Sequence, residues 1–214
     1  DPTALGVVLE KVKNAKRPVI IGGHGVWWSK SEEKLEQVGK ALRLPIFNVP
    51  YHSKLLCEEC EAYMGLADFH QYHPSKPAIH EADLVLMIGG RLDNQMNFGN
   101  PPFFIKDQTL VCINGSHEEL EYNQAADEVL LCDPGAFLEA LSGVGKMWPE
   151  WFDLQRTRRA AWVDEWYAHI EAESAKPGKM HPLQLSLDVQ EQMGENDWLI
   201  FDGGNTHFWS EIAV

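Results

Sequence analysis

The sequence lacks a long hydrophobic run. No stretch reaches the roughly 18 apolar residues that a membrane-spanning helix needs, and the opening stretch DPTALGVVLEKVKNAKRP has no hydrophobic signal core. We therefore expect a soluble protein with no membrane-spanning segment. Whether a targeting peptide precedes Asp1 is left open.

Positive charge is also scarce. The chain has 18 Lys and Arg residues against 32 Asp and Glu residues, which gives a formal net charge of −14 at pH 7. Binding to nucleic acid or to an anionic membrane draws on clustered Lys and Arg, so this balance disfavours both as partners. Small molecules or other proteins are the expected ligands.

Cysteines are too few for a disulfide scaffold, since a chain of 214 residues contains four of them. Cys112 and Cys132 lie in apolar, strand-like runs, where a free thiol behaves as a small hydrophobic side chain. This usage predicts a reducing compartment, and we expect a cytoplasmic location.

The familiar catalytic motifs are absent. The sequence contains no nucleophile elbow, no Walker motif and no paired acid/base dipeptide. A candidate zinc site consists of Cys57 and Cys60 with His52, His70 and His73 nearby. It is a single Cys-x-x-Cys pair, and the two glutamates between the thiols disfavour thiolate formation, so an ordinary loop is the alternative.

What the sequence does contain is an alternation of helical and extended patterns. Apolar, Val-, Ile- and Leu-rich runs bounded by Gly, Pro or Asp are typical of parallel strands with helices on both sides. Such runs occur at 18–23, 45–50, 83–90, 108–115 and 128–133, and helical patterns occur at 5–15, 31–42 and 135–144. Ser31 is the expected N-cap of the second helix. The pattern predicts an α/β domain over residues 1–145, with a doubly wound, mostly parallel sheet flanked by helices.

A second region follows. Residues 146–179 predict a long amphipathic helical linker, in which an aromatic stripe including Trp162 and Trp166 packs as core or interface rather than as a cofactor box. After the breaker KPGKMHP, residues 183–194 predict a helix and residues 197–204 a strand. These elements cannot bury their own faces, so 180–214 is either an extra edge of the first sheet or the opening of a truncated domain.

Glycine-rich turns follow three of the predicted strands. They are Gly22-Gly23-His24-Gly25, Gly89-Gly90-Arg91-Leu92-Asp93-Asn94 and Asn114-Gly115-Ser116. In open α/β sheets, ligands bind beyond the carboxyl ends of the strands, where glycines permit close approach and Arg91 offers a planar fork for a pyrophosphate or carboxylate. The turns predict a nucleotide site. The alternative is that the glycines serve only to form tight turns.

The order of these segments resembles that of the thiamine diphosphate (ThDP) dependent enzymes, the group of acetohydroxyacid synthase, pyruvate oxidase, benzaldehyde lyase and oxalyl-CoA decarboxylase. The segments that carry the resemblance are AKRPVIIGGHG, LPIFNVP, MGLADFHQY, ADLVLMIGGRLD and the run from LVCING to FLEAL. A later stretch, MHPLQLSLDVQEQMGENDWLIFDGGNTHFW, is similar to the start of that family's cofactor-binding domain, with Asp202, Gly204 and Trp209 at the family's spacing.

The resemblance implies a Rossmann-like central domain and a truncated start of the ThDP diphosphate-binding domain at 180–214. The glutamate that activates the cofactor and the segment that holds Mg²⁺ would lie in missing N- and C-terminal domains, and the parent enzyme would be a homo-oligomer, either a dimer or a tetramer. By position, the resemblance assigns three residues to the pocket for the ThDP diphosphate: Gly204, Asn205 and Thr206. It assigns five further residues to an FAD or ADP site: Gly23, Gly25, Gly90, Arg91 and Asn114.

Two departures from the family's pattern bear on these sites. Asn114 stands where members that bind FAD or ADP commonly have Asp, which weakens an interaction with a ribose hydroxyl. Asn205 stands where members often have Gln or Glu. Because many members of the family lack the dinucleotide, the central domain is expected to hold FAD, to hold ADP or to be empty.

The function that the resemblance implies is that of a ThDP- and Mg²⁺-dependent lyase, carboligase or decarboxylase. Its substrate would be a 2-keto acid, a 2-hydroxy acid or an acyl-CoA, and the fragment itself would be structural and catalytically incomplete. The alternative is a stand-alone or regulatory module that binds FAD, ADP or NAD. Such a module would not need the region from His181 onward.

We predict that the isolated chain self-associates, because the Trp-rich linker and the half-built second region leave apolar surface without its normal partners. Light scattering over a wide range of protein concentrations should show species larger than a monomer. A clean monomer throughout that range would contradict the prediction.

Overall fold

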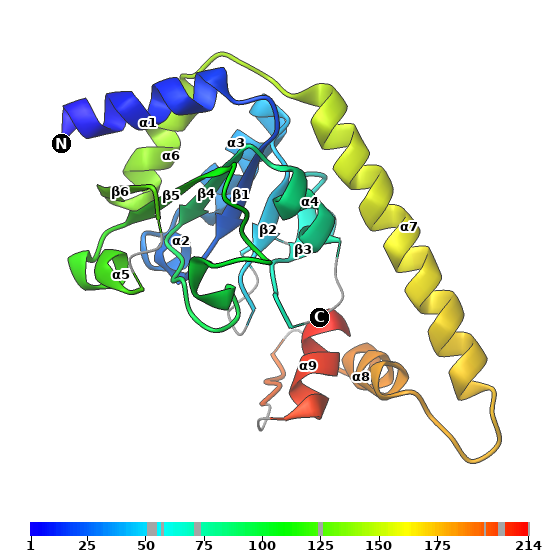
Figure 1. Ribbon diagram of the computed structural model, residues 1–214. Helices are drawn as coiled ribbons and strands as arrows, with labels where there is room; N and C mark the ends of the chain where they lie inside the picture. The colour runs from blue at the N-terminus through cyan, green and yellow to red at the C-terminus, as the bar shows by residue number, and fades with distance from the viewer. Residues whose placement is uncertain are drawn as a thin grey trace. The chain divides into compact units, whose positions relative to one another are not determined.

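The computed structural model describes residues 1–50, 55–56, 58–70, 74–123, 126–194, 196–200 and 204–213. Contacts divide the chain into unit 1, Asp1–Arg159, and unit 2, Ala160–Val214. Figure 1 shows the elements of both units, which are treated separately below.

Unit 1 is built on a parallel sheet whose strands follow the order β3-β2-β1-β4-β5-β6. Every neighbouring pair in this sheet is parallel. The chain therefore moves outward from β1 to β3, crosses back to β4 beside β1, and moves outward again to β6. The strands are β1 (Pro18–Gly22), β2 (Ile46–Asn48), β3 (Tyr63–Leu66), β4 (Leu84–Ile88), β5 (Thr109–Asn114) and β6 (Glu128–Leu131).

The central strands are apolar because both of their faces are covered. Every residue of β1 and β4 is buried, and in β5 all but Thr109 are buried. Continuous apolar runs of this kind are what a parallel sheet between two helical layers requires. The predicted doubly wound α/β class is confirmed.

The helices cover both faces of the sheet (Figure 1). Parallel crossovers are right-handed, and the connections from β1 to β2 and from β3 to β4 run in opposite directions across the sheet. Their helices therefore lie on opposite faces. One layer contains α1 (Pro2–Asn14), α3 (Glu32–Leu42) and α6 (Pro134–Ser142), and α6 packs against the other two. The other contains α4 (Ser75–Glu81), which contacts β3, and α5 (His117–Glu121), which contacts β5 and β6.

Two local features differ from the sequence prediction. Strand β3 was not predicted, because four residues containing Gly65 at φ +104° carry too weak a signal. Ser31 occupies the predicted N-cap position of α3, but its hydroxyl donates to the Val26 carbonyl and makes no capping hydrogen bond. The predicted N-cap position is confirmed, but Ser31 does not form the capping hydrogen bond expected there.

Two tryptophans anchor the start of α7 (Pro149–Ser174) to the sheet. The Trp148 indole N–H donates to the Ala15 carbonyl and that of Trp151 to the Pro18 carbonyl, each at 2.9 Å. Phe152 is completely buried beside them. Helix α7 then continues across the boundary between the units at Arg159/Ala160. The division into 1–145, 146–179 and 180–214 stays a prediction.

Unit 2 contains the rest of α7 with α8 (Pro182–Glu191) and α9 (Asn205–Ala213), which pack on each other. The aromatic stripe packs inside this unit, since the Trp166 ring lies 5.9 Å from Trp162 and 5.8 Å from Trp209 between centroids. Edge-to-face contacts of this kind are typical of a hydrophobic core. α8 ends at Glu191, three residues before the predicted end at Gly194.

The strand predicted at 197–204 is not formed in its described part. Asp197–Ile200 has no strand structure, and 201–203 lie outside the described residues. A strand requires a hydrogen-bonded neighbouring strand, and the described part of unit 2 contains no strand. The side chains of Trp198 and Ile200 are left 91% and 87% exposed. Among the described residues, the sheet of unit 1 consists of the strands from β3 to β6 in the order given above.

The described cysteines Cys60, Cys112 and Cys132 are free thiols. None of the described helices combines the length and hydropathy that crossing a bilayer requires. Burial of Cys112 in β5 raises the pKa of its thiol to about 12.

We predict that Cys112 resists alkylation in the folded protein. Below its raised pKa the thiol stays protonated, and the thiolate is the nucleophile. Iodoacetamide at pH 8 followed by peptide mass spectrometry should leave Cys112 unmodified, while the partly exposed Cys132 reacts first. Denaturation should abolish the difference. Equal labelling of Cys112 and Cys132 before denaturation would contradict the prediction.

Candidate functional site

The site lies where the direction of chain winding reverses. β1 and β4 are neighbours in the sheet, yet the chain leaves β1 toward β2 and leaves β4 toward β5. The loops that follow such a pair diverge and open a crevice at the carboxyl ends of the strands. This is where the glycine turns at Gly22 and Gly89 begin.

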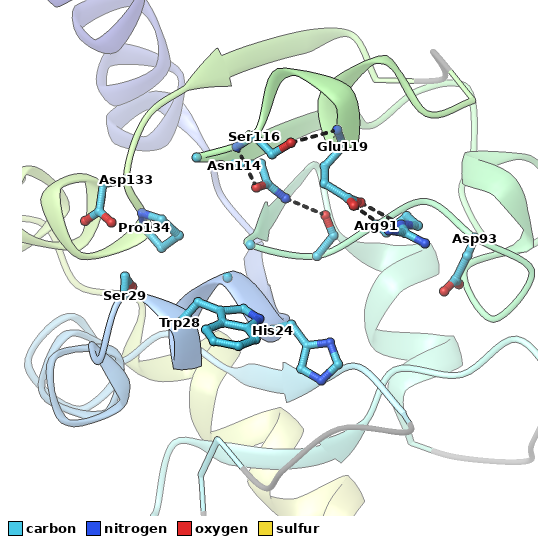
Figure 2. A pocket seen from close by; sticks show the side chains of 14 residues that line it. His24, Trp28, Ser29, Arg91, Asp93, Asn114, Ser116, Glu119, Asp133 and Pro134 are labelled. Carbon is cyan, nitrogen blue, oxygen red and sulfur yellow. Dashed lines mark hydrogen bonds and ion pairs between the residues drawn. The ribbon is translucent and has the colours of Figure 1, made fainter.

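A pocket of about 670 Å³ occupies this crevice. That volume is within the range of small-molecule sites, about 300–1,000 Å³. Figure 2 shows Trp28 and His24 on one side, with Asn114, Ser116 and Glu119 on the other. The lining residues are His24, Gly25, Trp28, Ser29, Gly89, Gly90, Arg91, Asp93, Asn114, Gly115, Ser116, Glu119, Asp133 and Pro134.

The glycine turns after β1 and β4 pack directly on each other. The Gly23 amide donates to the Ile88 carbonyl at 2.9 Å, and the Gly25 amide donates to the Gly89 carbonyl at 2.8 Å. A Cβ on Gly23 would lie 2.4 Å from the Gly90 Cα, and one on Gly25 would lie 2.7 Å from the Gly89 Cα. These positions are therefore glycine because two stretches of backbone meet there.

Arg91 is held by an acidic partner. Its guanidinium makes a two-point ion pair with the Glu119 carboxylate through Nε and a terminal nitrogen (Figure 2). The guanidinium carbon also lies 5.1 Å from the centroid of the Tyr122 ring. The hydrogen bond from Arg91 lowers the pKa of Glu119, and the hydrogen bond to Glu119 raises the pKa of Arg91. Both groups are charged at neutral pH.

Asn114 connects two loops of the pocket. Its side-chain amide donates to the Gly90 carbonyl at 3.3 Å, and its oxygen accepts from the Ser116 amide at 3.1 Å. Ser116 is the N-cap of α5, and its hydroxyl accepts from the Glu119 amide. The network fixes α5, and with it Glu119, beside the β4 turn.

The opposite wall is aromatic. Trp28, on the five-residue helix α2 (His24–Trp28), is 74% exposed and packs edge-to-face with Trp27 at 4.7 Å between ring centroids. Burial and the nearby Arg91 charge lower the pKa of His24. Its imidazole is therefore neutral at pH 7.

The structure brings together four residues that the sequence assigned to an FAD or ADP site: Gly25, Gly90, Arg91 and Asn114 line one pocket. Gly23 lies next to it as the N-cap of α2. Their role at a nucleotide stays a prediction. The sequence analysis included Asp93 only as part of the loop after β4. It missed Trp28, Glu119 and Asp133, although Ser116-x-x-Glu119 is the pattern of a capping box and marks the start of α5.

The charges and hydrogen bonds around the pocket disfavour the diphosphate of FAD or ADP. Among the described residues that line the pocket, Asp93, Glu119 and Asp133 carry negative charge, and Arg91 carries the permanent positive charge. Arg91 is already paired, and the amides of Gly23 and Gly25 donate to facing carbonyls.

The residues assigned to the ThDP diphosphate lie in unit 2. Gly204 has φ +101°, a Cβ there would meet open space, and Asn205 begins α9. A left-handed glycine followed by a helix N-terminus is an arrangement that accepts a phosphate group. Thr206 continues α9, and nothing further is described of its side chain.

Of the five residues of the candidate zinc site, the structure describes two, Cys60 and His70. Cys60 is buried, and the His70 ring nitrogen Nε2 lies 3.1 Å from the Asn94 carbonyl oxygen. His52, Cys57 and His73 lie outside the described residues. Within the part of the chain that the structure describes, no three His, Cys, Asp or Glu side chains are grouped to hold a metal ion.

Comparison with known proteins identifies the family. The model for "Thiamine pyrophosphate enzyme, central domain" matches residues 5–141. The chain belongs to the thiamine pyrophosphate (ThDP) enzyme family. The match spans every strand of the sheet and the whole pocket.

Relatives of this ThDP family member include lyases and synthases. It is 24% identical over 210 residues to human 2-hydroxyacyl-CoA lyase 1, covering 96% of this chain and 35% of that protein. It is 25% identical over 150 residues to the acetolactate synthase large subunit of Lactococcus lactis, covering 70% of this chain and 26% of that protein. The chain thus spans about a third of the length of the first of these relatives.

A solved structure of a ThDP enzyme is similar in fold. The ThDP-dependent 4-hydroxybenzoylformate decarboxylase of Rhodococcus jostii matches with a TM-score of 0.57 and 16% identity. The match covers 68% of this chain and 28% of that one.

We predict that Gly23→Ala strongly destabilises unit 1, by about 1–3 kcal/mol or more, because overpacked sites cost this much and the new Cβ would meet backbone. Gly115→Ala is the matched control at the same edge of the sheet, since a Cβ there meets nothing within 4 Å. Urea unfolding monitored by circular dichroism measures both. Similar midpoints for the two variants would contradict the prediction.

Proposed function

We propose that this chain is the central part of a ThDP-dependent lyase that cleaves a carbon–carbon bond of a 2-hydroxyacyl-CoA. The observation that carries the proposal is the length of one match. Human 2-hydroxyacyl-CoA lyase 1 aligns over 96% of the chain, through both units, whereas the acetolactate synthase of L. lactis aligns over 70%.

The match through unit 2 also favours an enzyme over a stand-alone nucleotide-binding module. A module built around the pocket of unit 1 would need neither α8 nor α9. In the proposed enzyme, Gly204, Asn205 and Thr206 at the start of α9 contribute to the pocket for the ThDP diphosphate. Mg²⁺ accompanies that group, and its ligands lie on parts of the parent protein other than the described residues.

When bound, ThDP supplies a nucleophilic carbon and accommodates the electron pair that is left when the substrate bond breaks. The contribution of this chain is positional. The sheet of unit 1 and the two indole hydrogen bonds at Ala15 and Pro18 hold the first turns of α7. α7 leads into the segment that carries Gly204. The other domains of the parent chain and a second subunit are its proposed partners.

The experiment is an assay of the protein that the full reading frame encodes, with ThDP and Mg²⁺ added. We expect a 2-hydroxyacyl-CoA to be cleaved at least about tenfold faster than pyruvate is converted, a difference worth about 1.4 kcal/mol in the barrier. The aldehyde that retains the substrate's hydroxyl-bearing carbon is measured by mass spectrometry. Dialysis against a chelator should abolish the activity, and returning ThDP with Mg²⁺ should restore it.

Two results would contradict the proposal. Conversion of pyruvate with no carbon–carbon bond cleavage of the 2-hydroxyacyl-CoA would favour a synthase or decarboxylase of the same family. Cleavage that is unaffected by removal of ThDP and Mg²⁺ would exclude ThDP chemistry for this protein.

A further inference from the structure

The pocket between the β1 and β4 turns carries a negative charge. Asp93, Glu119 and Asp133 are its acidic lining residues, Arg91 supplies one positive charge, and His24 is neutral at pH 7 because its pKa is lowered. One positive and three negative groups leave a net charge of −2 among the described lining residues. A phosphate group brought into this pocket is repelled.

Three groups in or beside the pocket that could attract a phosphate already have partners. Arg91 gives two of its N–H donors to Glu119, and bidentate pairs of this kind are among the stronger hydrogen bonds in proteins. The amides of Gly23 and Gly25 donate to the Ile88 and Gly89 carbonyls. To bind any of these three groups, a phosphate would have to displace a carboxylate or separate two packed turns.

Other features of the pocket suit an uncharged ligand. The exposed indole of Trp28 provides a flat surface on which an aromatic ring can stack (Figure 2). Asp93 and Asp133 each use one carboxylate oxygen to accept from a backbone amide, those of Gln95 and Ala136. Carboxylate oxygens accept hydrogen bonds from hydroxyl groups. A ligand that combines an aromatic ring with hydroxyl groups, on the ring or on an attached sugar, matches both walls.

We propose that Glu119 is a specificity-determining residue, which makes this pocket accept an uncharged, hydroxylated aromatic ligand and reject one that carries phosphate. Glu119 acts in two ways. It adds a negative charge, and it occupies the guanidinium of Arg91. The proposal rests on the geometry of unit 1 and is independent of the reaction proposed above.

Glu119→Gln tests this role directly. The amide has nearly the shape of the carboxylate, but it removes the charge and leaves Arg91 without its anionic partner. Glu118→Gln is the matched control, because Glu118 is on the same helix, is exposed and does not line the pocket. It makes the same change in net charge.

Adenosine and ADP are suitable probes, since both carry the same ring and ribose and differ in the diphosphate. Isothermal titration calorimetry of the chain without added metal should give adenosine an affinity at least about tenfold higher than that of ADP, which corresponds to about 1.4 kcal/mol. Glu119→Gln should raise the affinity for ADP about tenfold or more and leave that for adenosine within about threefold of the unsubstituted protein. Glu118→Gln should change neither.

A double variant identifies the source of the gain. Adding Arg91→Gln to Glu119→Gln should return the ADP affinity to its original value, because the released guanidinium is what attracts the phosphate. Trp28→Ala should weaken adenosine binding about tenfold, as loss of a stacking surface does. Circular dichroism confirms that each variant is folded.

Three outcomes would overturn the proposal. One is an unsubstituted protein that binds ADP as tightly as adenosine. Another is a folded Glu119→Gln variant with no gain in ADP affinity. The third is the absence of binding by either probe to any variant, which would mean that the pocket is not a site for this class of ligand. None of these outcomes bears on the lyase assay of the full-length protein.

Discussion

The close approach of two backbone turns organises the first unit of this protein. The Gly23 and Gly25 amides of the turn after β1 donate to the Ile88 and Gly89 carbonyls at the end of β4. The two stretches of backbone lie too close to leave room for a Cβ on Gly23, Gly25 or Gly89. This contact closes the base of the crevice that the reversal of winding opens. The positions of α2 and Trp28 on one wall, and of Arg91 on the other, depend on it.

The same contact has a chemical consequence. At a switch point, the backbone amides of glycine turns usually donate to a ligand. Here the Gly23 and Gly25 amides donate instead to backbone carbonyls of the facing segment. Arg91 is likewise taken by Glu119, which Ser116 and Asn114 hold in place at the start of α5. A pocket in the expected place of a nucleotide site thereby acquires an acidic and aromatic character.

The local sequence was sufficient to predict the main strands. It was insufficient to predict whether a short segment, or one without a neighbouring strand, forms a strand. β1, β4 and β5 lie within long apolar runs, and each such run identifies a strand by itself. β3 has four residues and owes its existence to pairing with β2. The segment at Trp198 has the composition of a strand, but it finds no neighbouring strand within the described part of unit 2.

The sequence by itself determined the α/β class, the family and the set of loops that carry the pocket, because these follow from periodicity and from the order of motifs along the chain. Only the tertiary structure decided what those loops can bind. Arg91 and Glu119 are 28 residues apart in the chain, and the Gly23 amide meets a carbonyl at Ile88. Whether a guanidinium or an amide is available to a ligand depends on its partner, and folding selects partners by proximity in space.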